Sequence, residues 1–205
     1  TPGAKPGCCR MTFPNNAPNH VLLRIMQSGE WAQSDAQTVT GVEQFHGMKA
    51  FVYGQFSQPF EFTAAEQNRN RKGGLVSWTQ DKPAVIEFQY AISFISDQQA
   101  KANFESEIAG RSFESMKADA RRAWSGVLNQ IEVQGGTESQ RRTFYTALYR
   151  CYERMMDITE DGRYYSNYDK KIHTADRPFY VDDWVWDTYL AHHPLRTILN
   201  PDQEA

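Results

Sequence analysis

The first half of the chain is a series of short apolar runs separated by polar or Gly/Pro-containing breaks. The clearest runs cover residues 21–26, 48–56, 75–78 and 85–95. In the last run the apolar residues occupy alternate positions: Ile86, Phe88, Tyr90, Ile92 and Phe94. A period of two places these side chains on one face of a long strand. The pattern therefore predicts a β-rich half that buries this face against a core.

After Asp97 the apolar spacing changes to three and four residues, which is the period of an α-helix. The positions that carry this period are Phe104, Ile108, Phe113, Met116, Ala120, Trp124, Val127, Leu128 and Ile131. Residues 131–133 read as a short extended piece that ends at Gly135 and Gly136. Strands followed by helices predict an α+β chain built from two parts.

Another helix is predicted after the two glycines. Thr137 and Gln140 have the spacing of a capping box, and the helix is expected to run to about Met156. Its apolar stripe consists of Phe144, Ala147, Leu148, Cys151 and Met155. Asp161-Gly162 predicts a turn before a tyrosine-rich stretch. A last helix is expected over residues 184–199, stopped by Pro201.

The composition is that of a globular chain, because 40% of the 205 residues are hydrophobic and 23% are charged. The formal charge of -3 is spread along the chain without a run of like charge, so nucleic acid is not a predicted partner. No apolar run approaches the roughly 18 to 20 residues of a membrane-spanning helix. Three cysteines (Cys8, Cys9 and Cys151) form neither an even disulfide framework nor a CxxC metal motif.

The richest stretch of chemistry is FYVDDWVWDTYLAHHPLRTILNPD, residues 179–202. Aromatic faces stack on the CH face of a sugar ring, and carboxylates accept hydrogen bonds from vicinal hydroxyls. On one helix, Asp183, Trp186 and Asp187 would share a face at the mouth of a pocket. Two alternatives stay open, because the aromatic residues can equally pack in a core and Asp183 can equally cap the helix.

The histidines point less clearly to chemistry. His192 and His193 are neighbours, so on a helix they face different directions, and no third ligand follows at a metal-ligand spacing. A structural role is therefore favoured for both. His46 and His173 stand alone in predicted loops and are expected at the solvated surface.

Three motifs occur in an order that resembles the start of the catalytic domain in glycoside hydrolase family 92. They are TESQRRTFYTALYR (137–150), DGRY (161–164) and WDTYLAHHPLRTILNP (186–201). Upstream, RMTFP (10–14) and ISFISDQQAKANFESEI (92–108) resemble the β-sandwich and linker helices of that family. The resemblance implies two partial domains: part of an antiparallel β-sandwich in residues 1–96, linker helices in 97–136 and the first helices of an (α/α)6 barrel in 137–205.

The resemblance also implies an activity, because members of the family are exo-acting, inverting, calcium-dependent α-mannosidases, many of them acting on N-glycans or mannan. It implies mannose-containing glycans as partners, calcium as cofactor and a secreted or periplasmic location. Asp187 matches a residue that holds hydroxyls of the terminal mannose, and Trp186 matches part of the pocket wall. The general acid, the general base and most calcium ligands are expected downstream of Ala205, so this chain by itself is expected to be inactive.

Two other functions are compatible with the residues alone. A non-catalytic carbohydrate-binding protein would show the same aromatic and acidic richness. Another inverting hydrolase that joins a sandwich to an (α/α)6 barrel would share the fold. The order of the three motifs favours family 92 over both. The chain departs from the commoner family pattern at Asp183 and Trp184.

Overall fold

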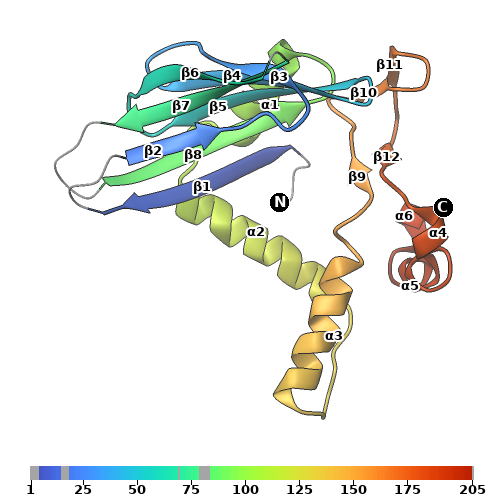
Figure 1. Cartoon of the computed structure of the whole chain (residues 1–205). Coiled ribbons are helices and arrows are strands. Elements are labelled where there is room, and N and C mark those ends of the chain that lie inside the picture. The colour runs from blue at the N-terminus through green and yellow to red at the C-terminus, as the bar shows by residue number, and fades with distance from the viewer. Residues whose placement is uncertain (1–4, 15–18, 69, 79–83, 205) are drawn as a thin grey trace.

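The computed structural model describes residues 5–14, 19–68, 70–78 and 84–204. These residues form a mixed α+β structure in which a large sheet is followed by helices and short strands (Figure 1). The sheet strands are β1 (Pro6–Phe13), β2 (Asn19–Leu23), β3 (Ser28–Gln33), β4 (Thr38–Phe45), β5 (Met48–Phe56), β6 (Glu61–Asn68), β7 (Arg71–Trp78) and β8 (Ala84–Ser93). The predicted α+β class is confirmed.

The eight strands pair in the order β1-β8-β5-β4-β3-β7-β2, and β6 lies on the other edge of β7. All pairs are antiparallel except β3 with β7, which is parallel over two residue pairs. The sequence led us to expect a sandwich of two sheets. The described strands instead belong to a single sheet. They form one continuous sheet that curls over itself and encloses a core (Figure 1).

The enclosed core is aromatic and aliphatic. Its buried members are Leu23, Val39, Phe56, Phe60, Val76, Trp78 and Ile86. Phe88 packs against this core and stacks on Phe56 with 4.4 Å between ring centroids. A Cβ at Gly54 would lie 2.6 Å from the Phe88 ring, so β5 needs glycine opposite this stack. The alternating face predicted for β8 therefore does contact the core.

The opposite face of β8 is also buried, which the alternation alone does not show. Ala91 and Ser93 are inaccessible to solvent because α1 (Asp97–Glu107) packs across β8 and β5. Ala91, together with Phe104, Ile108 and Met116, forms a second core beneath α1 and α2 (Phe113–Leu128). Ser96 and Ser112 cap these two helices by accepting backbone N–H bonds, so both helices begin where polar caps occur in the sequence.

The capping box is confirmed at the start of α3 (Glu138–Arg150), where Thr137 and Gln140 bond each other's backbone. The predicted helix end at Met156 is wrong. Met155 has a positive φ of 42°, and Met156–Asp157 forms β9, which pairs with β12 (Tyr180–Val181). The helical spacing of apolar residues continues to Met155, but α3 ends at Arg150 because Met156 and Asp157 pair with the distant strand β12.

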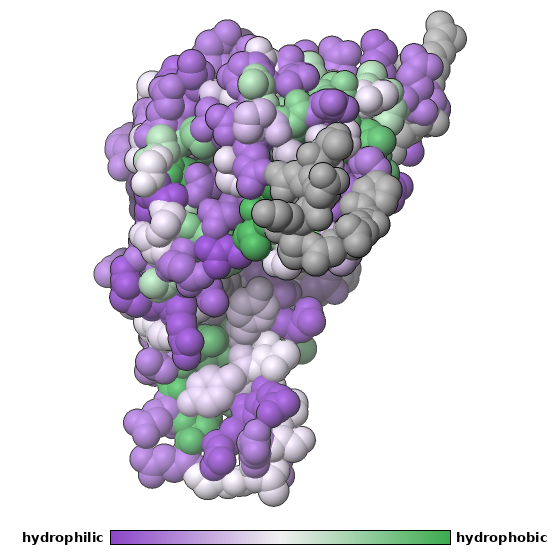
Figure 2. Space-filling model, turned by 90° about the vertical axis from the view of Figure 1, so that its left-hand side faces the viewer, coloured by the Kyte–Doolittle hydropathy of each residue, from purple (hydrophilic) through white to green (hydrophobic). Residues whose placement is uncertain are grey.

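The α2–α3 pair projects away from the sheet (Figure 1). Trp124 and Tyr149 pack between the two helices with ring centroids 4.5 Å apart. Figure 2 shows apolar residues among polar ones on this narrow part of the surface. Residues 131–133 are not a strand; instead the Tyr145 hydroxyl donates to Ile131 O and accepts from Val133 N.

The predicted single helix over residues 184–199 is wrong. The structure has α4 (Val185–Thr188) and α5 (His192–Leu199), followed by α6 (Pro201–Glu204). Pro194 explains the break, because it lacks an N–H for the Leu190 carbonyl and is tolerated only in a first helical turn. The predicted helix end is confirmed, because α5 ends at Leu199, and Pro201 then begins α6, in agreement with the preference of proline for the first helical position.

Candidate carbohydrate site

A buried polar network fixes the start of the C-terminal segment on the sheet. Glu160 is 3% exposed, and its two carboxylate oxygens accept bonds of 2.8 Å from the Phe94 N–H and the Asn103 side-chain amide. Gln99 extends the network by donating to Asn103 and Asp161 and by accepting from Arg163. We call these residues the Glu160 network. It anchors residues 160–163 to α1 and to the end of β8.

Lys5 adds a second attachment next to this network. Its Nζ donates to the Asp157 carbonyl at 2.6 Å. Burial lowers the pKa of Lys5, while the nearby carboxylates of Glu160, Asp157 and Glu107 oppose that shift. The strand β9 is thus held by the N-terminal part of the chain as well as by β12.

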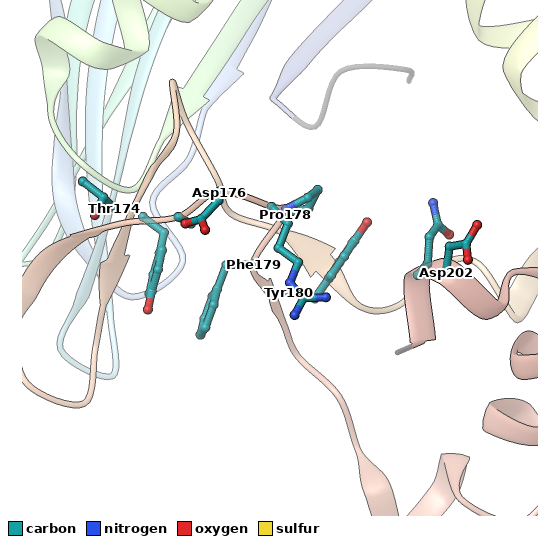
Figure 3. A pocket seen from close by; sticks show the side chains of 10 residues that line it. Thr174, Asp176, Pro178, Phe179, Tyr180 and Asp202 are labelled. Atoms are coloured by element: carbon teal, nitrogen blue, oxygen red, sulfur yellow. The ribbon is translucent and has the colours of Figure 1, made fainter.

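The chain that follows the anchored residues 160–163 forms one wall of a pocket of about 490 Å³, a volume typical of small-molecule sites. The wall comes from the hairpin of β10 (Arg163–Ser166) and β11 (Lys171–Thr174) and from the loop that follows it. The pocket is lined by Tyr164, Thr174, Ala175, Asp176, Arg177, Pro178, Phe179, Tyr180, Asp202 and Gln203. Figure 3 shows Phe179 and Tyr180 on one side and Asp202, from α6, on the other.

Aromatic stacking orders the wall of this pocket. The rings of Tyr164 and Phe179 are nearly parallel, with an interplanar angle of 5° and centroids 3.9 Å apart. The His173 ring stacks on Tyr164 with centroids 5.4 Å apart, and the carboxylate of Asp169 accepts a hydrogen bond from His173 Nε2 at 2.9 Å. The hydrogen bond with His173 lowers the pKa of Asp169. Phe179 ends the stack and is 39% exposed.

A cluster centred on His193 ties the last three helices together. His193 Nδ1 lies 3.1 Å from Glu204 on α6, and Nε2 lies 3.1 Å from Asp183 before α4. The bond with Glu204 raises the pKa of His193, burial opposes the rise, and Asp183 adds to it. Burial would raise the pKa of Asp183, but hydrogen bonds from Thr188 and His193 lower it overall. The cluster is therefore an ion-pair network that holds α4, α5 and α6 in place.

Arg196 completes this His193 cluster from α5. Its Nε lies 2.7 Å from Glu204 Oε1, and both side chains are almost completely buried. The N–H does not point at the oxygen, so the contact is an ion pair without hydrogen-bond geometry. The His192 ring stacks on that of His193 with centroids 5.9 Å apart, and His192 contacts the Cys151 carbonyl on the α3 side. Both histidines therefore make structural contacts, as the sequence favoured.

The structure separates the residues that the sequence grouped on one helix face. Asp183 precedes α4 and accepts a bond from Thr188 Oγ1 at 2.9 Å, so the predicted shared face with Trp186 and Asp187 is wrong. The helix cap is Trp184, without a side-chain bond, so Asp183 does not cap α4 either. Trp186 is 92% exposed on α4.

Asp187 is exposed on α4, and within the described part of the chain its carboxylate has no hydrogen-bond or ion-pair partner. Neither Asp187 nor Trp186 lines the pocket of Figure 3. The sequence patterns gave no indication that Tyr164 and Asp176 belong to a site, and they marked Phe179 only as the first residue of the stretch 179–202. The Asp161-Gly162 turn and the aromatic pair at 179–180 were visible signals, but nothing local indicated that Tyr164 and Phe179 would meet.

Metal and membrane features are absent from what the structure describes. No three His, Cys, Asp or Glu side chains among the described residues gather into a group that could hold a metal ion. No helix in the described ranges is long and apolar enough to cross a membrane. Cys8, Cys9 and Cys151 are all free thiols.

An ordered aromatic wall with carboxylates around it is typical of proteins that bind carbohydrate. Comparison with known families agrees with this class. The family described as "Glycosyl hydrolase family 92 catalytic domain" matches residues 99–205, which is more than half of the chain. The chain belongs to glycoside hydrolase family 92.

Solved structures and a curated relative agree with this assignment. The family GH92 inverting mannosidase BT2199 from Bacteroides thetaiotaomicron is 25% identical and superposes with a TM-score of 0.83 over 94% of this chain. The α-mannosidase BT3965 from the same species shares the fold, with 22% identity and a TM-score of 0.80 over 95% of this chain. An uncharacterized secreted glycosidase of Arthroderma benhamiae is 36% identical over 84 residues, or 39% of this chain.

The chain spans only part of each of these proteins. It covers 29% of BT2199, 30% of BT3965 and 11% of the Arthroderma benhamiae glycosidase.

Proposed function

We propose that this chain forms part of an enzyme that removes terminal α-linked mannose from glycans with inversion of configuration. One observation carries the proposal: 94% of the chain superposes on an inverting mannosidase with a TM-score of 0.83 and 25% identity. Membership of family 92 supports a glycoside hydrolase independently of that superposition. N-glycans or mannan are the proposed substrates. In this proposal α3 to α6 are the first helices of an (α/α)6 barrel.

We assign Asp187 and Trp186 to sugar binding. An ionised Asp187 offers two acceptor oxygens, which suit a pair of vicinal hydroxyls. Trp186 presents an open ring to which the CH face of a pyranose can pack. Both side chains are exposed on α4, and the His193 cluster fixes this helix through Asp183 and Thr188. In this proposal they bind sugar and transfer no proton.

Proton transfer is assigned to no residue of this chain. An inverting glycosidase needs a protonated acid with a raised pKa and a carboxylate roughly 6.5 to 9.5 Å away. The Asp183 carboxylate has a lowered pKa, and Glu204 is engaged by His193 and Arg196. Burial does raise the pKa of Glu107, but this residue ends α1 near Lys5 and lines none of the pocket of Figure 3. We therefore expect the 205-residue chain to bind sugar without turnover.

Calcium and a secreted or periplasmic location remain part of the proposal for the whole enzyme. Calcium prefers oxygen ligands and would engage sugar hydroxyls. Because the described residues do not gather into a metal-holding group, we assign no calcium ligand and no step through calcium to this chain. The location is supported by the curated relative, which is described as a secreted glycosidase.

The proposal is tested by isothermal titration calorimetry of the chain with methyl α-D-mannopyranoside. Wild type should bind the sugar, and Trp186→Ala and Asp187→Asn should each weaken this binding at least tenfold. The same samples should release no 4-nitrophenol from 4-nitrophenyl α-mannoside. Binding that is unaffected by both substitutions would contradict the assigned roles, and detectable release would contradict the expected lack of turnover.

A further inference from the structure

We propose that the pocket of Figure 3 is a second sugar-binding site, which holds a neutral pyranose unit of the glycan through the open face of Phe179. This inference rests on the proposed function for one point, namely that the ligand is a mannose-containing glycan. The pocket shares no lining residue with the sugar contacts assigned to Trp186 and Asp187.

The aromatic platform is built before any ligand arrives. Tyr164 lies against one face of the Phe179 ring at 3.9 Å, and the ring itself forms part of the pocket wall. The Phe179 N–H donates to Thr159 Oγ1 at 2.7 Å, and its carbonyl accepts from Ile158 N at 3.0 Å. A sugar that stacks on Phe179 therefore orders little of the protein, and this lowers the entropic cost of binding.

The two ends of the loop that carries this platform are also fixed. Ala175 N donates to Gly162 O at 2.8 Å, where the loop leaves β11. At the other end, Tyr180 pairs with Asp157 in the β12–β9 ladder. Gly162 follows Asp161, which bonds Gln99 in the Glu160 network. The platform is thereby connected to the buried polar contacts on the sheet.

The polar side chains around the platform are available for hydroxyls. Among the described residues, no hydrogen bond or ion pair engages the side chains of Asp176, Arg177 or Asp202, all of which line the pocket. Asp202 belongs to α6, whose position is fixed by Glu204 through His193. Carboxylates accept from sugar hydroxyls and a guanidinium donates to ring or hydroxyl oxygens.

The charge of the pocket selects among sugars. Two carboxylates and one guanidinium give the pocket lining a formal net charge of about −1. An anionic ligand, such as a sugar phosphate or a uronic acid, would be repelled by this balance. A neutral hexopyranose meets an apolar face and several hydrogen-bonding groups, so it is the class of ligand that the pocket fits.

The test is a titration of the 205-residue chain, labelled with ¹³C in its phenylalanine rings, with methyl α-D-mannopyranoside and with α-mannobiose. Wild type should show ligand-dependent shifts of the Phe179 ring signal, identified by its loss in Phe179→Ala. In isothermal titration calorimetry with the same sugars, Phe179→Ala should weaken binding at this site about tenfold, whereas Phe179→Tyr, which keeps the platform, should retain it. The double variant Asp176→Asn/Asp202→Asn should weaken binding while the ring stack stays intact.

Tyr168→Ala is the matched control, because Tyr168 is a fully exposed aromatic residue of the same hairpin that lies outside the pocket. Binding that Phe179→Ala weakens and Tyr168→Ala leaves unchanged supports the inference. If sugar causes no Phe179 shift, or if Phe179→Ala binds like wild type, the inference is overturned. A loss confined to Asp187→Asn would overturn it while leaving the proposed function intact. Pocket binding together with wild-type affinity in Asp187→Asn and Trp186→Ala would contradict the proposed function alone.

Discussion

Removing the Glu160 carboxylate should strongly destabilise the junction between the sheet and the C-terminal segment. Glu160→Ala leaves the Phe94 N–H and one Asn103 amide N–H without an acceptor, while the other Asn103 N–H still donates to the Ile92 carbonyl. Each buried donor without a partner costs about 1 to 3 kcal/mol, so the expected total is roughly 2 to 6 kcal/mol. Lys5 also loses the largest of the favourable charges that oppose its desolvation.

Glu160→Gln separates the hydrogen bonds from the charge. The amide keeps an oxygen for the Phe94 N–H, but it turns an NH2 group toward the Asn103 amide, whose own oxygen is already bonded by Gln99. We expect this variant to lose about 1 to 3 kcal/mol, less than the alanine variant. Glu153→Ala is the control, because its surface ion pair with Arg150 is expected to contribute at most about 1 kcal/mol.

Urea unfolding, followed by circular dichroism, measures these differences. Hydrogen exchange of the Phe94 and Phe179 amides should accelerate in Glu160→Ala if the C-terminal segment detaches first. A loss below about 0.5 kcal/mol in Glu160→Ala, which is typical of an ordinary surface position, would refute the assignment of the network as the anchor.

Two further predictions concern the helices. Because Glu204 and Asp183 raise the pKa of His193 against the effect of burial, the cluster should stabilise fully below about pH 6.5, the unfolded value, and lose that contribution as the pH rises through the folded pKa. The Tm should therefore fall from pH 6 to pH 9 in wild type and less so in His193→Gln; parallel curves would contradict this. Thr137→Ala removes the capping box and should cost about 1 kcal/mol at the start of α3. Hydrogen exchange should increase at Gln140 and not in α2, and unchanged exchange would show that the cap contributes nothing.

Local sequence patterns predicted the helices and strands whose positions depend on neighbouring residues alone. The alternation from Ile86 to Phe94 placed β8, and the Thr137/Gln140 spacing placed the start of α3. Both signals are complete within a few residues. The end of α3 could not be predicted in this way, because Met156–Asp157 pairs with strand residues more than twenty positions later. Pro194 offered a local sign of the break before α5 that the helical period concealed.

The candidate sites also combine features that the local sequence indicates with features that depend on contacts between distant residues. The sequence pointed to residues 179–202 for sugar-binding chemistry, which stays a prediction; Phe179, Tyr180 and Asp202 of this stretch line the pocket, whereas Trp186 and Asp187 do not. The Tyr164–Phe179 stack could not be inferred, because it depends on the Glu160 network and on the β9–β12 pair. The roles of Asp187 and Trp186 and the domain limits at residues 96 and 136 stay predictions.

The measurement that tests the central claim most directly is kcat/KM for α-mannoside hydrolysis in an active enzyme that contains this segment, compared between wild type and Asp187→Ala. If Asp187 holds mannose hydroxyls in the transition state, kcat/KM should fall by at least about 10²-fold, or roughly 3 kcal/mol, with an unchanged Tm. A loss below about fivefold at unchanged Tm, or a wild type without activity on α-mannosides, would contradict the account.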